Sequence, residues 1–266
     1  NLSVTATTGN ITDTVALAVS GTSSFTTSAS NGTITLNTST NALSGAVSLS
    51  TTGSSGNATI DNGTTALNIA ASTIGGNLAV TAGDSITDSG IITVGGTASF
   101  TTDTSDKLIT LNSQNAITGQ VTFDTTSTGG DVYLDNGTTA ISLGTISTGD
   151  IGGDLTLLTD ADQTISNAIT LNGSGADLSI TVDNSNSLTI QAALTTNAGD
   201  ITLSGDDDVI FTAAGDLTSV NGDITVRADD DSTSDAESGG ALTMVDGTVF
   251  NAGSGTITGI ADEDIT

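Results

Sequence analysis

The chain of 266 residues contains no cysteine, no proline, no histidine and no tryptophan. Without cysteine, neither a disulfide nor thiol chemistry is available, so backbone hydrogen bonds and an apolar core must hold the fold together. The lack of histidine and cysteine also removes the commonest general base and the thiol nucleophile. For catalysis, a pair of carboxylates remains possible, because glycoside hydrolysis needs only two suitably placed acids.

Basic residues are almost absent as well. The chain has two basic residues, Lys107 and Arg227, and 30 acidic residues, which gives a net charge of −28. Nucleic acids and anionic membranes attract proteins through Lys and Arg, so we expect neither as a partner. No apolar run approaches the roughly 18 residues needed to cross a bilayer, and we expect no membrane insertion. The first residues, Asn1 to Val4, lack the regions of a signal peptide, so we expect any export signal to lie outside this stretch.

Glycine, threonine, serine, asparagine and aspartate are abundant between short aliphatic runs, and one pattern returns every 23 residues from Asp154 to Asp231. Four strand openings share it: Asp154-Leu155-Thr156-Leu157, Asp177-Leu178-Ser179-Ile180, Asp200-Ile201-Thr202-Leu203 and Asp223-Ile224-Thr225-Val226. The same offset links Ile165, Leu188 and Phe211. A period of this length is typical of solenoids, in which each unit stacks on a near-copy of itself.

A larger repeat is superimposed on this period. Asn1–Ala6 matches Asn77–Ala82, and residues 61–66 return unchanged as residues 135–140. We therefore expect one continuous body over residues 1–266, built from larger units. The units are residues 1–76, 77–153 and 154–256, followed by a partial unit, 257–266.

The step between strand openings is mostly 20 to 24 residues, but three steps are longer by about ten. The inserts that lengthen them contain residues 57–63, 131–137 and 240–247. Each is interpreted as an additional short strand followed by a turn, and as the preferred place for lateral contacts.

Alternation within the strand openings indicates the fold class. Leu155 and Leu157 lie on one face of their strand with Thr156 on the other, and the neighbouring openings repeat this pattern. The sequence predicts an all-β, single-stranded parallel β-solenoid of about eleven coils, each of roughly 20–24 residues with periodic longer coils. We expect right-handed coiling, because right-handed crossovers dominate parallel strand connections. A sandwich or an array of small domains is the alternative, but 23 residues are too few to bury a core of their own.

Aspartates recur at equivalent turns of consecutive coils, where like charges would repel and a calcium ion would neutralise them. The candidate calcium ligands are Asp160, Asp162, Asp183, Asp206, Asp208, Asp229 and Asp231. In the alternative interpretation these residues are turn formers whose carboxylates point into water. The Gly-Asp pairs that precede the strand openings are predicted to form coil corners, with the carboxylate bonding local backbone amides.

Three further sets of residues suggest alternative functions. Outward Thr156, Ser179, Thr202 and Thr225 resemble the threonine ranks of ice-binding β-solenoids. An ice-binding or carbohydrate-binding β-solenoid module is therefore the alternative function. Polysaccharide-degrading β-helices need two acids and aromatic platforms for sugars, but the aromatic residues here are Tyr133 and five phenylalanines. Because the acids recur periodically instead of marking one cleft, we expect no enzyme activity. Asn-x-Ser/Thr sequons at positions including Asn62 and Asn136 are candidate glycan acceptors.

The phrases Ala198–Leu203, Asn221–Val226 and Gly240–Val249 resemble repeats of filamentous-haemagglutinin-like adhesins, which are giant secreted bacterial surface proteins. The resemblance implies a right-handed parallel β-helix, export across the envelope, and a role in adhesion, a biofilm matrix or an extracellular fibre. We therefore expect a non-catalytic structural protein located outside the cell or on its surface. Its expected partner is another copy joined end to end, or the continuation of the same chain, with an unidentified surface or polysaccharide as ligand.

Overall fold

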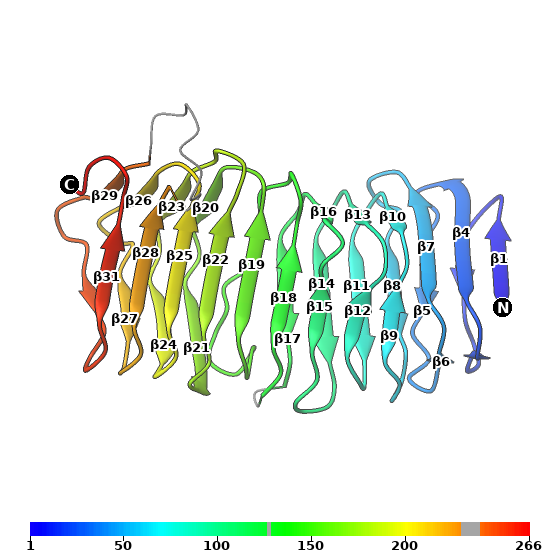
Figure 1. Cartoon of the computed structure of the whole chain (residues 1–266). Helices are drawn as coiled ribbons and strands as arrows, with labels where there is room; N and C mark the ends of the chain where they lie inside the picture. Colours follow the sequence, from blue (N-terminus) through cyan, green and yellow to red (C-terminus); the bar gives the residue numbers. More distant parts are fainter. Residues whose placement is uncertain (127–128, 230–239) are drawn as a thin grey trace.

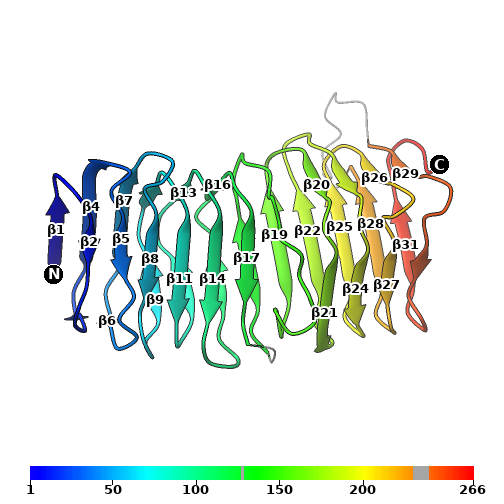
Figure 2. The ribbon, with the colours of Figure 1, turned by 180° about the vertical axis from the view of Figure 1, so that it is seen from behind.

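The computed structural model describes residues 1–126, 129–229 and 240–266. In this part of the chain all regular structure is β, with strands β1 to β31 and no helix, and hence no helical segment able to cross a membrane. The strands pair in parallel and stack into an elongated β-solenoid of about ten turns, with the two termini at opposite ends (Figures 1 and 2). The predicted fold class is confirmed, with a number of turns close to the expected eleven.

Each turn of the solenoid has three faces. The first face holds β1 (Leu2–Ala6), β4 (Ser23–Ser30), β7 (Val47–Thr52), β10 (Ser72–Ile74), β13 (Ile92–Val94), β16 (Ala116–Ile117), β20 (Gln163–Ile165), β23 (Leu188–Ile190), β26 (Val209–Phe211) and β29 (Leu242–Met244). The second holds β2 (Ile11–Thr12), β5 (Ile34–Leu36), β8 (Ala58–Asp61), β11 (Leu78–Ala82), β14 (Ala98–Thr102), β17 (Val121–Asp124), β21 (Ile169–Ser174), β24 (Leu194–Asn197), β27 (Leu217–Ser219) and β30 (Phe250–Asn251). The third holds β3 (Ala18–Val19), β6 (Ala42–Leu43), β9 (Leu67–Ile69), β12 (Ile86–Asp88), β15 (Ile109–Leu111), β18 (Val132–Asp135), β19 (Leu155–Thr159), β22 (Leu178–Val182), β25 (Ile201–Gly205), β28 (Ile224–Ala228) and β31 (Ile257–Ile260).

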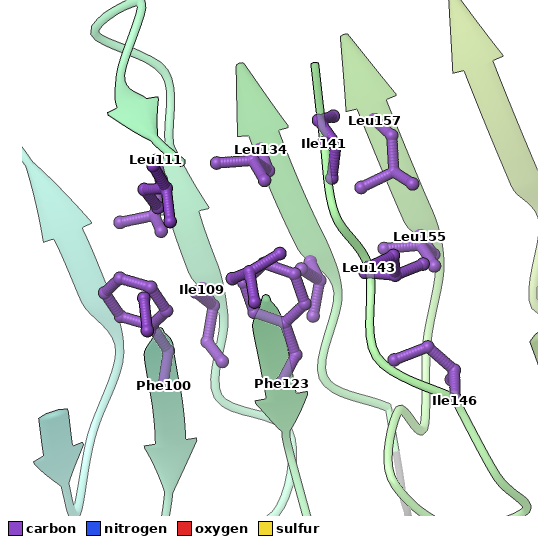
Figure 3. Close-up of a cluster of buried hydrophobic side chains, with 14 of the residues drawn as sticks. Phe100, Ile109, Leu111, Phe123, Leu134, Ile141, Leu143, Ile146, Leu155 and Leu157 are labelled. Atoms are coloured by element: carbon purple, nitrogen blue, oxygen red, sulfur yellow. The ribbon is translucent and has the colours of Figure 1, made fainter. Parts of the chain in front are cut away.

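Aliphatic side chains from all three faces fill the interior as one continuous core. On the third face, Leu155, Leu178, Ile201 and Ile224 stack in register, as the 23-residue period predicts, and each is at most 1% exposed. Figure 3 shows the core where the second unit meets the third. There the rings of Phe100 and Phe123 stack with their centroids 5.9 Å apart.

On the other two faces the step is not constant. Ile165 pairs with Ile190, which pairs with Phe211, so the predicted column through Leu188 is wrong. Leu188 instead pairs with Gln163 and with Val209. The corners between faces differ in length from coil to coil. The spacing in sequence between paired strand residues therefore varies, and apolar residues still point inside.

The first two larger units do not contain a whole number of turns. The insert strand β8 pairs with β5 below it and with β11 above it, so the second unit opens on the second face, whereas the first opens with β1 on the first face. In the same way β18 pairs with β15 and with β19, and the third unit opens on the third face. The first two inserts are the additional strands that the sequence predicts, and each rotates the following unit by one face.

The third insert corrects that interpretation. Strand β29, inside residues 240–247, pairs with β26 and therefore takes the regular place on the first face. The added length lies before it, because the amide of Ala241 bonds to Asp208, 33 residues earlier. Residues 230–239 fall in this interval and lie outside the described part of the chain.

Buried side-chain amides repair the ladder at places where strand pairing is interrupted. Between β16 and β20, the Oδ1 of Asn136 accepts a hydrogen bond from the amide of Ile117 (2.9 Å), and its Nδ2 donates to the carbonyl of Ile117 (3.1 Å). Asn62 bonds Leu43 in the same way, and Gln163 bonds Ile141. Asn62 and Asn136 are at most 1% exposed, so the folded chain cannot carry glycans at these two sequons.

We expect Asn136→Ala to lower the free energy of unfolding by about 2–4 kcal/mol, because it leaves a buried amide and a buried carbonyl of Ile117 without partners. Urea denaturation measures the change. The matched control is Asn112→Ala, at an exposed position one coil below, where the expected change is within about 0.5 kcal/mol. Equal losses in the two variants would contradict the proposed repair role.

Candidate functional site: two aspartate ladders

The first set of aspartates lies at the corner that leads into the third face and is called here the corner ladder: Asp131, Asp154, Asp177, Asp200 and Asp223. In each case Oδ1 accepts a hydrogen bond from a backbone amide one coil further on. The bonds are Asp154 N to Asp131 (3.0 Å), Asp177 N to Asp154 (2.8 Å), Asp200 N to Asp177 (2.7 Å), Asp223 N to Asp200 (2.8 Å) and Thr256 N to Asp223 (2.7 Å).

This geometry corrects the expectation that the corner carboxylates bond local amides. Each carboxylate joins two coils instead, so the corner ladder is part of what holds the stack together. A glycine precedes several of these aspartates because the coils approach closely at the corner. A Cβ at Gly199, for example, would overlap the carbonyl oxygen of Ala176.

The corner ladder stabilises the stack at an electrostatic cost. Burial raises the pKa of Asp154 above its ordinary value of 3.8, and the charges of Asp131 and Asp177 raise it further. The hydrogen bond from the amide of Asp177 acts in the opposite direction. The hydrogen bond from the amide of Asp177 therefore stabilises the ionised form of Asp154, whereas burial and the neighbouring charges destabilise it.

The second set, called here the turn ladder, contains the candidate calcium ligands and follows the last residues of β19, β22, β25 and β28. Asp160, Asp183 and Asp206 occupy successive coils, with the amide of Asp183 bonded to Thr159 (2.9 Å) and that of Asp206 bonded to Val182 (2.9 Å). The column is broken at Asp229, whose φ is +61° and whose amide bonds to the carbonyl of Asp207 (3.2 Å). Asp231 lies outside the described residues.

The turn-ladder carboxylates accept backbone hydrogen bonds. Oδ2 of Asp206 accepts from the amide of Ser185 (2.6 Å), and Oδ1 of Asp162 accepts from the amide of Ser187 (3.0 Å). Oδ1 of Asp208 accepts from the amide of Ala241 (2.8 Å). Each of these three bonds joins two coils and does not close a turn within one coil.

No three acidic side chains of the described residues come together in a group that could hold a metal ion. The structure therefore adds no support for calcium binding by Asp160, Asp162, Asp183, Asp206, Asp208, Asp229 and Asp231. That role stays a prediction.

On the third face, outward hydroxyls form one row. Thr156, Ser179, Thr202, Thr225 and Thr258 stand in register on the third face. The row two residues further on is mixed, because its members are Leu158, Thr181, Ser204, Arg227 and Ile260. The paired threonine ranks that characterise the ice-binding alternative are therefore incomplete.

One surface feature is not predicted from the sequence. An open groove of about 530 Å³ lies over β15, β18 and β19 and is lined in part by Tyr133. The sequence contains one clue, because the only tyrosine of the chain falls inside an insert. The clue does not indicate which residues of the neighbouring coils would surround the ring.

Comparison with known proteins finds a family match for part of the chain. Residues 1–50 and 55–124 match a family model described as repeats of unknown function (DUF5649). No curated protein and no solved structure matches the chain. The repeat match and the parallel coils together fit a β-helix repeat protein.

We expect Asp177→Ala to lower the free energy of unfolding by about 1–3 kcal/mol, because the amide of Asp200 loses a charged acceptor. Asp177→Asn keeps an oxygen at the same position and removes one charge from the corner ladder. Its stability should equal or exceed that of the wild type in low salt, with the difference shrinking in about 0.5 M NaCl. Urea denaturation distinguishes the variants, and an equal loss for both would contradict the hydrogen-bonding role.

Calcium binding is tested by thermal unfolding after chelation. If the turn ladder only needs screening, CaCl₂ and MgCl₂ at equal ionic strength should raise Tm by the same amount. A calcium site should give a larger rise with CaCl₂, and Asp206→Asn should reduce that excess.

Proposed function

We propose that this chain is a non-catalytic structural rod outside the cell, serving either as a segment of a cell-surface adhesin or as the repeating body of an extracellular fibre. The observation that carries the proposal is the stack of coils with one core cluster running through it from the first unit to the third. The resemblance of Ala198–Leu203 and Asn221–Val226 to adhesin repeats supports the same function.

The stacked coils are suited to a mechanical role. Most coils join the next through backbone hydrogen bonds, and buried side-chain amides take their place where strand pairing is interrupted. The aliphatic columns inside keep the coils in register. Bending or stretching such a body requires many bonds to break together. A stiff spacer of this kind holds whatever it carries at a fixed distance from its anchor.

The surface charge supports an extended rod in solution. The net charge of −28 opposes sideways association of neighbouring rods, and it disfavours nucleic acid and anionic membranes as partners.

The two ends of the stack supply the proposed contacts. Strand β31 at one end leaves Ile257 48% exposed and Ile260 44% exposed, and β1 lies at the opposite end (Figure 1). Both are edge strands of parallel ladders, which favour the addition of another coil of the same kind. In the proposal this coil belongs either to the continuation of the same chain or to a second copy.

Immunogold electron microscopy of native cells, with an antibody against this chain, tests the proposal. We expect label outside the cell on rods or filaments. Label at regular intervals along filaments of one protein would favour the fibre, whereas label on isolated stalks with distinct tips would favour the adhesin. Label confined to the cell interior would contradict both forms.

The intact mass of the native polypeptide separates the two forms independently. A segment of a giant adhesin predicts a polypeptide several times heavier than 25.9 kDa, and a fibre of separate copies predicts a mass near that value. A heavy polypeptide found in filaments made of one repeating chain would require the adhesin assignment to be revised.

A further inference from the structure

The groove on the third face lies where the second unit meets the third. Its walls include Thr110, Asn112, Asp131, Tyr133, Asp154 and Thr156. Its volume of about 530 Å³ is within the range of roughly 300–1,000 Å³ that is usual for small-molecule sites. The groove lies on the outward surface of a sheet and away from its edges, so a peptide cannot enter it by strand addition.

The aromatic ring of Tyr133 distinguishes this groove from the rest of the face. Tyr133 pairs in register with Thr110 on one side and with Thr156 on the other, so its partly exposed side chain stands between two small hydroxyl residues. A tyrosine has an apolar ring face and a polar hydroxyl tip. In this position the ring offers a flat apolar surface bordered by hydrogen-bonding groups.

Two corner-ladder carboxylates border the groove. Asp131 and Asp154 each use Oδ1 for a backbone amide, and an ionised carboxylate has further acceptor sites on its second oxygen. Asn112 adds an exposed amide that both donates and accepts. The nearby cation Lys107 forms an ion pair with Asp84 (3.0 Å), so it is drawn toward that carboxylate.

We propose that this groove binds a neutral oligosaccharide chain. The ring of Tyr133 would stack on the apolar face of a sugar, while Asp131, Asp154 and the threonines would bond its hydroxyl groups. A sugar polymer presents both kinds of surface on each ring, and the open groove would let the chain enter and leave along the face. The net charge of −28 disfavours anionic saccharides. The proposal goes beyond the rod function and holds for either form of it.

The first unit provides a natural comparison. The residue equivalent to Tyr133 is Thr59 on β8, which pairs with Thr35 and Ala79. The corner positions equivalent to Asp131 and Asp154 are Asn57 and Asn77. The first unit therefore has the same backbone arrangement without the ring or the two carboxylates.

Tyrosine fluorescence tests the proposal directly, because the chain has one tyrosine and no tryptophan. The probes are maltohexaose, cellohexaose and N-acetylchitohexaose, titrated into the purified chain. We expect a saturable change in tyrosine emission with at least one probe, little affected by about 0.5 M NaCl because the ligand is neutral. No change with any of the three would overturn the proposal.

Variants locate the binding by calorimetry. Tyr133→Phe keeps the ring and should stay within about threefold of the wild-type Kd, whereas Tyr133→Thr should weaken binding at least about tenfold. Asp131→Asn, which keeps an acceptor, should have a smaller effect. Unchanged thermal unfolding would show that each variant is folded, and undiminished binding by Tyr133→Thr would overturn the site.

A double variant, Thr59→Tyr with Tyr133→Thr, moves the single tyrosine to the equivalent strand of the first unit. It should retain tyrosine emission and lose the response to saccharide. An equal response would show that any exposed tyrosine suffices and would overturn the role of the groove. Salt-sensitive binding of pentalysine at Tyr133, without saccharide binding, would assign the groove to a cationic ligand instead.

Discussion

The structure depends on one constraint, which is that the backbone of each coil must bond in register to the coil before it. Register places equivalent residues directly above one another, so side chains of the same chemical type form columns along the stack. For aliphatic residues the result is favourable, because Leu155, Leu178, Ile201 and Ile224 form a continuous dry column. For aspartates the same stacking brings like charges together, and the coil needs a means of tolerating them.

The corner ladder accommodates those charges within the hydrogen-bonding scheme. Because each carboxylate accepts the amide of the next coil, a residue that repels its neighbours also ties them together. Asn62, Asn136 and Gln163 solve a related problem, since a buried side-chain amide offers the same donor and acceptor as a strand backbone. At these three positions the solenoid therefore tolerates an irregular coil, because the side-chain amide bonds the backbone groups of Leu43, Ile117 and Ile141.

The rotation of the larger units follows from the same register. An inserted strand pairs with the coils on either side, so it occupies one face of its coil. The following unit therefore starts one face later. This arrangement distributes the unit openings around the rod. It also places Tyr133, in the second insert, between Thr110 and Thr156 on the third face, whereas the equivalent Thr59 lies on the second face.

The sequence by itself determined the parallel solenoid, the inward residues of the third-face strands and the alignment of Asp154, Asp177, Asp200 and Asp223, because all three follow from a local period that the backbone ladder must preserve. Only the tertiary structure decided the partners of those carboxylates, the pairing of Ile165 with Ile190, and the place of β29. These depend on the number of residues in each corner. Close packing between coils sets that number, and it does not repeat with a fixed period in the sequence. The groove around Tyr133 arises for the same reason, since its walls come from three coils whose relative positions only the assembled stack fixes.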